Sequence, residues 1–120
     1  MYTIHEKEVE AMQLPGRSHK MIIGPDNFGK ARNMCFGVAN FPPDTTAPGH
    51  VHDIQEEILY VLSGKGNIYI GDNDPEKIIR GTCIYIPVGK THRIENTGSK
   101  VLKVAYVFSP PAKQGSYDKK

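Results

Sequence analysis

Glycine and proline interrupt this chain so often that no long helix fits into it. The 120 residues include 12 glycines and 9 prolines, and the short runs between them are rich in Val, Ile, Tyr and Phe. None of these runs has the 3.6-residue period of an amphipathic helix. The pattern therefore predicts an all-β domain in which many short strands form a sandwich or a barrel.

Seven runs are predicted to form strands, and Gly, Pro, Asn or Asp residues separate them. They cover residues 21–23, 33–41, 57–62, 67–70, 77–79, 83–86 and 100–108. In the sixth run, Ile84 and Ile86 are expected to share one face. The resulting plan has an N-terminal arm at residues 1–20, one folded domain at residues 21–109 and a flexible tail at residues 110–120.

Charge and cysteine content exclude several classes of function. The formal net charge is +2, from 15 basic and 13 acidic residues that are scattered along the chain, so we expect no nucleic-acid partner. There is no charged-then-apolar leader and no apolar run of about 18 residues, so we expect no signal peptide, no membrane span and a cytoplasmic location. Cys35 and Cys83 form neither a disulfide framework nor a zinc pattern and are expected to be small buried or half-buried residues.

The clearest chemical signal comes from His50, His52 and Glu57. On a strand, two histidines two residues apart lie on one face with their Cα atoms about 7 Å apart, close enough to share an ion. Glu57 lies five residues beyond His52, so the chain must turn before Glu57 for the carboxylate to point back at the histidines. The stretch therefore predicts three ligands of one metal ion.

The spacing of these three residues resembles the first motif of the cupin family, which ends here at Gly64. The second cupin motif is matched at every fixed position, by Gly81, Pro87, Gly89, His92 and Asn96. Asp44 stands where the first motif usually begins with Gly, and Asp is also common in turns. The resemblance covers residues 41–108 and implies a small single-domain cupin, a double-stranded β-helix or jelly-roll barrel.

The resemblance also implies a fourth ligand, His92. The implied set is then His50, His52, Glu57 and His92 around one divalent transition metal ion, either Mn, Fe, Ni, Co or Zn. Imidazole and carboxylate donors suit these ions and leave one or two coordination positions open. Glu56 fits a looser spacing, but only Glu57 leaves six residues before Gly64. Glu57 is also the predicted catalytic residue, because it can detach from the ion and act as a base.

Residues outside the motifs give weaker signals. Arg17 and His19 follow a turn in the arm, where they either clamp a substrate carboxylate or phosphate or lie in a solvated loop, which is the commoner case. His5 and His19 have no partner pattern and are interpreted as surface or packed residues. Tyr106 either lines the ligand pocket or fills the core, and the core is the preferred interpretation.

Two further groups of side chains are assigned to faces of the predicted sheets. Met34, Phe36 and Val38 are expected to line the metal cavity from a facing strand. Three tyrosines flanked by apolar residues are expected to face outward or to cover a subunit contact: Tyr60, Tyr69 and Tyr85. Together with an arm that has no core of its own, these tyrosines predict a homodimer.

Three hypotheses about function remain. The first is a metal-dependent enzyme on a small oxygen-rich substrate, with dioxygenase-like chemistry favoured and a sugar or sugar-acid isomerase or lyase as the alternative. The second is a non-catalytic module that binds a sugar or another small ligand. The third, a storage role, is disfavoured because the single domain keeps all four implied ligands. The sequence does not decide between the enzyme and the binding module.

Overall fold

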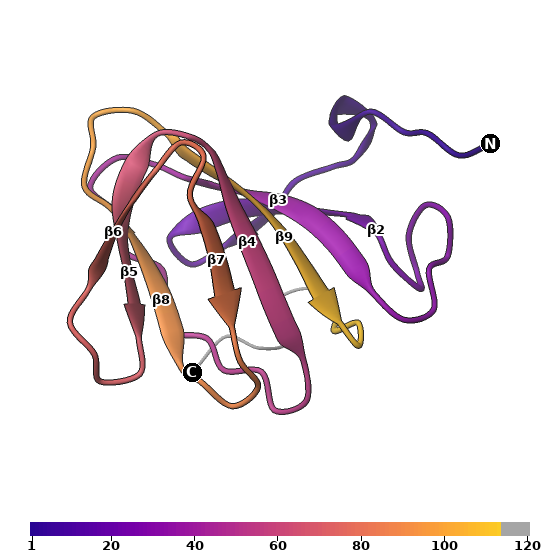
Figure 1. The fold of residues 1–120 in the computed structure, drawn as a ribbon. Helices are drawn as coiled ribbons and strands as arrows, with labels where there is room; N and C mark the ends of the chain where they lie inside the picture. Colours follow the sequence, from indigo (N-terminus) through magenta and orange to yellow (C-terminus); the bar gives the residue numbers. More distant parts are fainter. Residues whose placement is uncertain (114–120) are drawn as a thin grey trace.

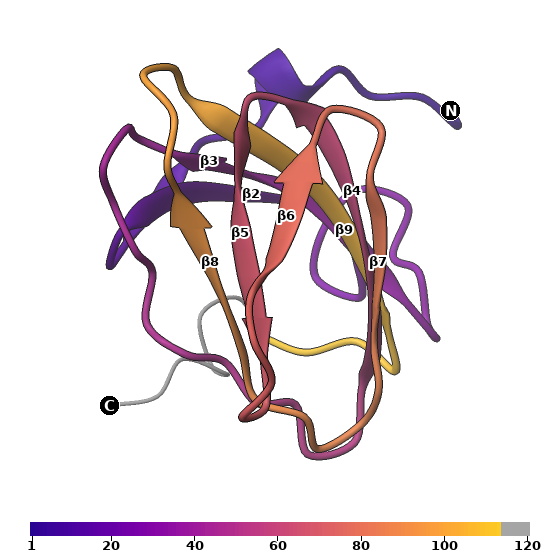
Figure 2. The same cartoon turned by 60° about the vertical axis from the view of Figure 1, so that its left-hand side comes forward.

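Two antiparallel β-sheets form the domain in a computed structural model that describes residues 1–113 (Figure 1). The larger sheet has six strands, in the order β1 (Met12–Leu14), β2 (Arg17–Ile23), β3 (Cys35–Phe41), β9 (Leu102–Ser109), β4 (Glu56–Ser63) and β7 (Cys83–Ile86). The smaller sheet has three strands, in the order β6 (Glu76–Ile79), β5 (Lys65–Ile70) and β8 (His92–Asn96). Figure 2 shows the smaller sheet in front of the larger one. The arrangement confirms the predicted all-β jelly roll.

The core lies between the sheets and is built by alternation along each strand. On β4 the inward residues Glu57, Leu59 and Val61 are buried and their neighbours are exposed. Ile84 and Ile86 of β7 are both buried, which confirms their predicted shared face. Burying one large aliphatic or aromatic side chain contributes about 1.5–3 kcal/mol. Other large members of the core are Phe41, Ile68, Ile78, Ile94, Leu102, Val104, Tyr106 and Phe108.

The larger sheet begins earlier than the sequence predicts. β2 starts at Arg17, and Ser18 pairs with Asn40 of β3. The boundary placed at residue 20 therefore falls inside a strand, and the short strand β1 was not anticipated. Of the tail at residues 110–120, residues 114–120 lie outside the described residues. Among residues 1–113, no helix is long and apolar enough to cross a membrane.

The N-terminal segment packs on the outer side of the larger sheet. It contains one turn of 3₁₀ helix, η1 (Glu6–Glu8), which His5 caps by accepting a hydrogen bond from the Lys7 N–H at 3.1 Å. Glu6 forms an ion pair with Lys103 of β9 at 2.6 Å. The apolar residues of the N-terminal segment, Ile4 and Val9, pack against a second small cluster formed by Ile22, Val38 and Ala105.

This packing explains why the expected face of β3 is wrong. Met34 and Phe36 are exposed, and Val38 is buried under the N-terminal segment, not in the cavity. The odd-numbered residues of β3 face the core instead, and most of them are small: Cys35, Gly37, Ala39 and Phe41. Both faces of β3 are apolar, so alternation alone could not tell them apart.

Gly37 leaves space for the side chain of Tyr106, which lies on the neighbouring strand β9. A Cβ atom on Gly37 would lie 2.3 Å from the Lys20 carbonyl oxygen and also close to the hydroxyl of Tyr106. No side chain fits in that space without movement of the β2 backbone. Gly37 therefore leaves room for the hydroxyl end of Tyr106 against β3.

The outward-facing tyrosines are confirmed, with one difference in exposure. Tyr60 and Tyr85 are about half exposed, at 46% and 55%. Tyr69 is half-buried, because the Arg93 guanidinium lies 3.7 Å above its ring centroid. Of the two cysteines, Cys35 is buried as expected, but Cys83 is exposed.

Motif residues that are not ligands shape the backbone. Asp44 has a φ of 57°, in the left-handed region where Gly is favoured and Asp is tolerated. Asn96 is 1% exposed and joins three segments. Its side-chain amide donates to the carbonyls of Phe41 and Lys100, both at 2.8 Å, and its oxygen accepts from the Gly98 N–H at 2.8 Å.

We predict that Asn96→Ala destabilises the fold by about 2–4 kcal/mol, because it leaves buried carbonyls without their donor. Urea unfolding followed by circular dichroism measures the change. Asn67→Ala is the matched control, since Asn67 is only half-buried and donates to Glu95. Equal losses in the two variants would show that Asn96 has no special structural role.

Candidate metal centre

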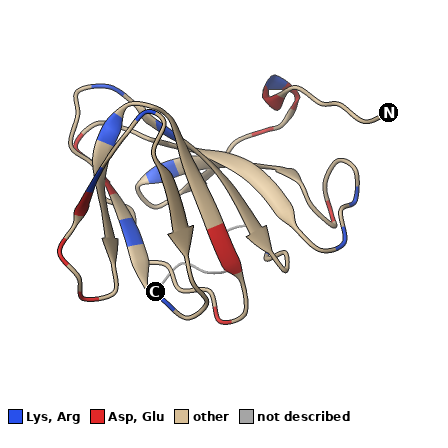
Figure 3. Cartoon of the chain, viewed as in Figure 1, with Lys and Arg blue, Asp and Glu red and all other residues tan. Residues whose placement is uncertain are grey.

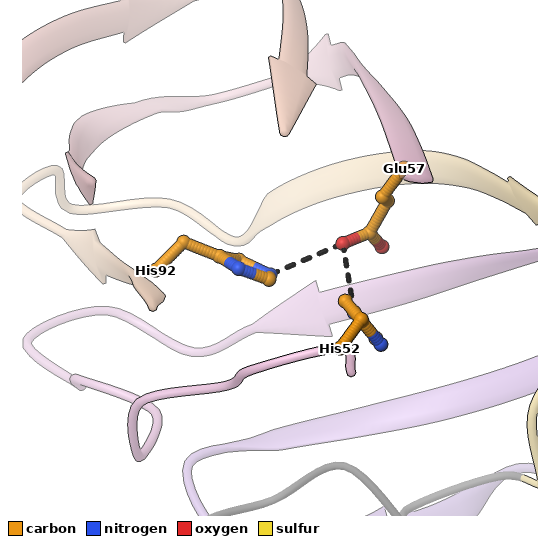
Figure 4. Close-up of side chains that lie close together, drawn as sticks. All are labelled: His52, Glu57 and His92. Carbon is orange, nitrogen blue, oxygen red and sulfur yellow. Dashed lines mark hydrogen bonds and ion pairs between the residues drawn. The ribbon is translucent and has the colours of Figure 1, made fainter. Parts of the chain in front are cut away.

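Three ligand-type side chains meet in the interior of the domain (Figure 4). Glu57 lies on β4, His92 is the first residue of β8, and His52 comes from the loop before β4. The Glu57 Oε1 atom lies 3.2 Å from His52 Nε2 and 3.1 Å from His92 Nε2. All three side chains are buried, and one donor atom from each lies within 4.8 Å of the others.

Backbone hydrogen bonds fasten the loop that carries His50 and His52 to the start of β8 and the loop before it. The N–H groups of His50 and His92 each donate to the other residue's carbonyl, at 2.7 and 2.8 Å. The Gly89 N–H donates to the His52 carbonyl at 2.9 Å. The sequence analysis placed His50 and His52 on a regular strand, and this expectation is wrong. Instead, an isolated bridge to His92 positions this loop.

Glu57 is held as a carboxylate. Burial alone would raise its pKa, but hydrogen bonds and electrostatic interactions with His52 and His92 lower the pKa to about 2. The acid is therefore ionised at neutral pH, which is the form that binds a metal ion. The alternative residue, Glu56, is exposed and accepts a hydrogen bond from the Tyr85 hydroxyl at 2.6 Å.

The three residues fit a divalent transition metal ion. Imidazole nitrogen and carboxylate oxygen bind such ions at about 2.0–2.2 Å, so adjacent ligands around one ion lie about 3 Å apart. The two separations that involve Glu57 Oε1 are 3.1 and 3.2 Å. Neutral imidazole and carboxylate donors also suit Mn, Fe, Co, Ni and Zn.

His50 lies next to this group but is not one of its three members. Its ring centroid is 5.3 Å from that of His92, and the two rings are nearly perpendicular at 86°. It is half-buried and faces the same cavity as Glu57 and His92. Its role as a fourth ligand stays a prediction.

A cavity of about 30 Å³ opens beside the donors. Its walls are mostly apolar, and their polar part comes from Arg17, His19, His50, Glu57, His92 and Tyr106. Tyr106 is 4% exposed and so belongs both to the cavity wall and to the core.

The solvated-loop interpretation of Arg17 and His19 is wrong. Both residues are on β2, and their exposed fractions are 4% and 2%. The sequence does contain an indication that Arg17 and His19 face inward, because they alternate with Met21 along one strand and so share its face. This indication was missed because two polar residues at the start of a strand resemble a loop.

Residues 37–108 match the Cupin domain family. The chain belongs to this family. It is 40% identical over 85 residues to an uncharacterised protein of Methanocaldococcus jannaschii, covering 71% of this chain and 67% of that protein. It is 32% identical over 113 residues to auxin-binding protein 1 of Arabidopsis thaliana, covering 87% of this cupin chain but only 56% of that relative's length. An oxalate-binding protein of Thermotoga maritima is 34% identical over 80 residues, covering 66% of this chain and 63% of that protein.

Solved structures support the same fold. A crystal structure described as a predicted oxalate decarboxylase from Thermotoga maritima superposes with a TM-score of 0.79 at 20% identity, covering 91% of this chain and 99% of that one. The polyketide cyclase RemF from Streptomyces resistomycificus gives a TM-score of 0.78 at 23% identity, covering 92% of this chain and 80% of that one. At this level of identity, the likeness establishes the cupin fold alone.

We predict that the cupin purified without added metal carries about one divalent transition metal ion per chain, and that Glu57→Gln or His92→Ala weakens its affinity at least about tenfold. Elemental analysis after dialysis measures the content. His5→Ala is the control, because His5 caps η1 away from the cavity. If the double variant His50→Ala with His92→Ala kept the wild-type metal content, the site would be assigned wrongly.

Proposed function

We propose that this cupin is a metal-dependent enzyme that acts on a small oxygen-rich molecule held in the cavity beside His52, Glu57 and His92. The observation that carries the proposal is the position of the buried donors. Glu57 and His92 belong both to the donor group and to the cavity wall. A molecule in the cavity therefore lies within reach of an ion bound by these residues.

In this proposal His50 supplies a fourth ligand from its place beside His92. With four protein ligands, a six-coordinate ion would have two positions left for oxygen atoms of a substrate. When bound, the ion supplies Lewis acidity or electron transfer to O₂. The protein residues orient the substrate, and the apolar part of the wall limits the entry of water.

Glu57 has a second role in the proposed mechanism. While bound to an ion, Glu57 would not be free to accept a proton. Once detached from the ion, its burial would raise the pKa of the carboxyl group and let it accept a substrate proton. We favour oxidation of an enediol or catechol-like compound by O₂. Isomerase or lyase chemistry on a sugar acid would use the same residues without oxygen.

A non-catalytic binding module is the second candidate. Two relatives are named for binding, one for auxin and one for oxalate, whereas a structural neighbour is described as a predicted decarboxylase. The cavity of about 30 Å³ has room for about one or two water molecules, so a ligand of either kind must displace part of the cavity wall. Turnover distinguishes the two candidates.

We predict that the metal-loaded cupin consumes O₂ with at least one member of a panel of enediols, catechols and 2-oxo acids, and that Glu57→Gln lowers this rate by about 100-fold or more. An oxygen electrode and product analysis measure the reaction. Turnover that persists without oxygen would replace the oxidase assignment by isomerase or lyase chemistry. Stoichiometric binding without turnover would support the binding module, and equal turnover by metal-free protein would contradict both.

We also propose that the chain forms a homodimer through the outer face of its larger sheet. The strand registers join Tyr85, Ile58, Val107 and Phe36 into one apolar row across β7, β4, β9 and β3. Ile58 and Tyr60 are each 46% exposed. In Figure 3, β7 and the part of β4 beyond Glu57 carry no charged residue. An apolar row of this kind, with the exposed carboxylate of Glu56 beside Tyr85, suits a two-fold axis that pairs it with the same face of a second copy.

We predict that the protein sediments as a dimer at micromolar concentration and that Ile58→Lys with Tyr60→Lys makes it monomeric, because the charges cannot be buried in the contact. Ile79→Lys is the control, since Ile79 is 61% exposed on β6 of the smaller sheet. Removing residues 1–14 should weaken the dimer if the N-terminal segment contributes. A wild-type monomer at this concentration would exclude the interface.

A further inference from the structure

The cavity beside the metal donors is smaller than any molecule proposed to enter it, so part of its wall must move. Its volume of about 30 Å³ holds about one or two water molecules. Strands β3, β9 and β4 each have a neighbouring strand on both sides in the larger sheet, so their backbones cannot shift without breaking hydrogen bonds. A segment that packs on the core but belongs to neither sheet can move at a lower cost.

Residues 110–113 form such a segment, the C-terminal strap. β9 pairs with β4 as far as its last residue, Ser109, whose hydroxyl donates to the Asn33 carbonyl at 2.6 Å and so anchors the root of the strap. The strap begins with two prolines, which have no N–H group to donate and therefore cannot extend the ladder. The chain turns back from the end of β9 (yellow in Figure 2), and Ala112 packs against the main core cluster.

Two hydrogen bonds join the strap to the residues around and below it. The Gln55 Nε2 atom donates to the Pro111 carbonyl at 3.3 Å, and this contact is only partly buried. A backbone hydrogen bond joins Ala112 to the thiol of Cys35. A single hydrogen bond of this kind contributes little to stability beside the packing of a core residue. The loss of either contact should therefore ease the opening of the strap and leave the sheets intact.

Below the strap, a row of side chains leads to the metal donors. Cys35 is fully buried and is paired in register with Phe108. The Phe108 ring lies 5.0 Å from that of His52 and 5.1 Å from that of Tyr106, which belongs to the cavity wall. Burial raises the pKa of the Cys35 thiol, and the charge of Glu57 adds to this rise. Opening of the strap therefore uncovers Cys35 and gives Phe108 room to move away from the donors.

A groove of about 490 Å³ beside the strap gives the strap room to move. It lies between the strap and the loop that follows β2, and its lining includes Met21, Asn27, Pro111 and Ala112. Met21 also belongs to the main core cluster, so the groove ends against the core. Binding sites for small molecules have volumes of about 300–1,000 Å³. The groove therefore also has room for a molecule on its way to the cavity.

We propose that the C-terminal strap is a gate that opens to admit small molecules to the metal donors and then closes over them. The strap turns about its root at Ser109, and in the open state Ala112 leaves the core. The inference rests on the proposed function in requiring that a molecule enters the cavity, and it holds for an enzyme and for a binding module alike. Because opening uncovers Cys35, the reactivity of this thiol reports the gate without metal or substrate.

The rate at which Cys35 reacts with a chromogenic disulfide, dithiobisnitrobenzoate, tests the gate in the full-length protein dialysed free of metal. Cys83→Ser removes the exposed thiol from every sample, so Cys35 alone reacts. Gln55→Ala removes one hydrogen bond from the strap and should raise the rate about 2- to 10-fold. Ala112→Asp should raise it at least about tenfold, because its charge cannot stay in the core. Thr82→Ala, the matched control, removes a side chain that accepts from a backbone N–H in another turn, and it should leave the rate unchanged.

Removal of zinc by a chelator tests whether the gate leads to the donors. Zinc-loaded protein is mixed with dipicolinate at concentrations where the rate of zinc loss rises with the amount of chelator. Gln55→Ala and Ala112→Asp should speed this loss by about the same factors as they speed the reaction of Cys35. Urea unfolding verifies that each variant is folded under the conditions of both measurements.

Two results would overturn the gate while the proposed function stood. One is an unchanged thiol rate in folded Gln55→Ala and Ala112→Asp, and the other is a faster thiol reaction with unchanged zinc loss. If Ala112→Asp did not fold, Gln55→Ala would decide alone. A protein that bound no zinc would contradict the proposed function, and the thiol rates would then decide the inference by themselves.

Discussion

The structure depends on the burial of one ionised carboxylate between two β-sheets. Removing a carboxylate from water costs several kcal/mol unless other groups replace the lost hydration. At Glu57 two imidazoles provide that replacement, at 3.2 and 3.1 Å from one oxygen. The histidines themselves are fixed by main-chain hydrogen bonds between their loops. The backbone thus sets the donor geometry, and a metal ion would enter a site whose parts are already in place.

The two cupin motifs divide these tasks among their residues. Asp44 forms a turn with a φ of 57°, a backbone conformation that few residues other than Gly, Asn and Asp tolerate. The Asn96 side chain makes three hydrogen bonds to backbone groups and has no contact with the donor group among those described. Only the histidines and Glu57 remain for chemistry. A motif match by itself therefore indicates a fold with a suitable group of metal donors, and the choice of ligand depends on cavity residues that the motifs do not include.

The sequence predicted most of the strands from local rules and the carboxylate of the site from its resemblance to the cupin motif. Alternation placed Ile84 and Ile86 correctly, and the motif's spacing to Gly64 distinguished Glu57 from Glu56. The sequence-based prediction failed where long-range packing decides which face of a strand is buried in the cavity. β3 is apolar on both faces, so only the N-terminal segment, which covers Val38, fixes which face meets the cavity. Arg17 and His19 were missed for the related reason that polar residues on an inward face oppose the usual hydrophobic pattern.

Gly37 links the size of the cavity to the stability of the sheet. The Tyr106 ring occupies the space that a side chain at position 37 would need, and Tyr106 is also part of the cavity wall. A larger residue at position 37 would push the ring toward the ligand and strain the contact between β2 and β3. A smaller residue at position 106 would enlarge the cavity while leaving a void against β3. A change of cavity size made at Tyr106 is therefore coupled to position 37 on the adjacent strand.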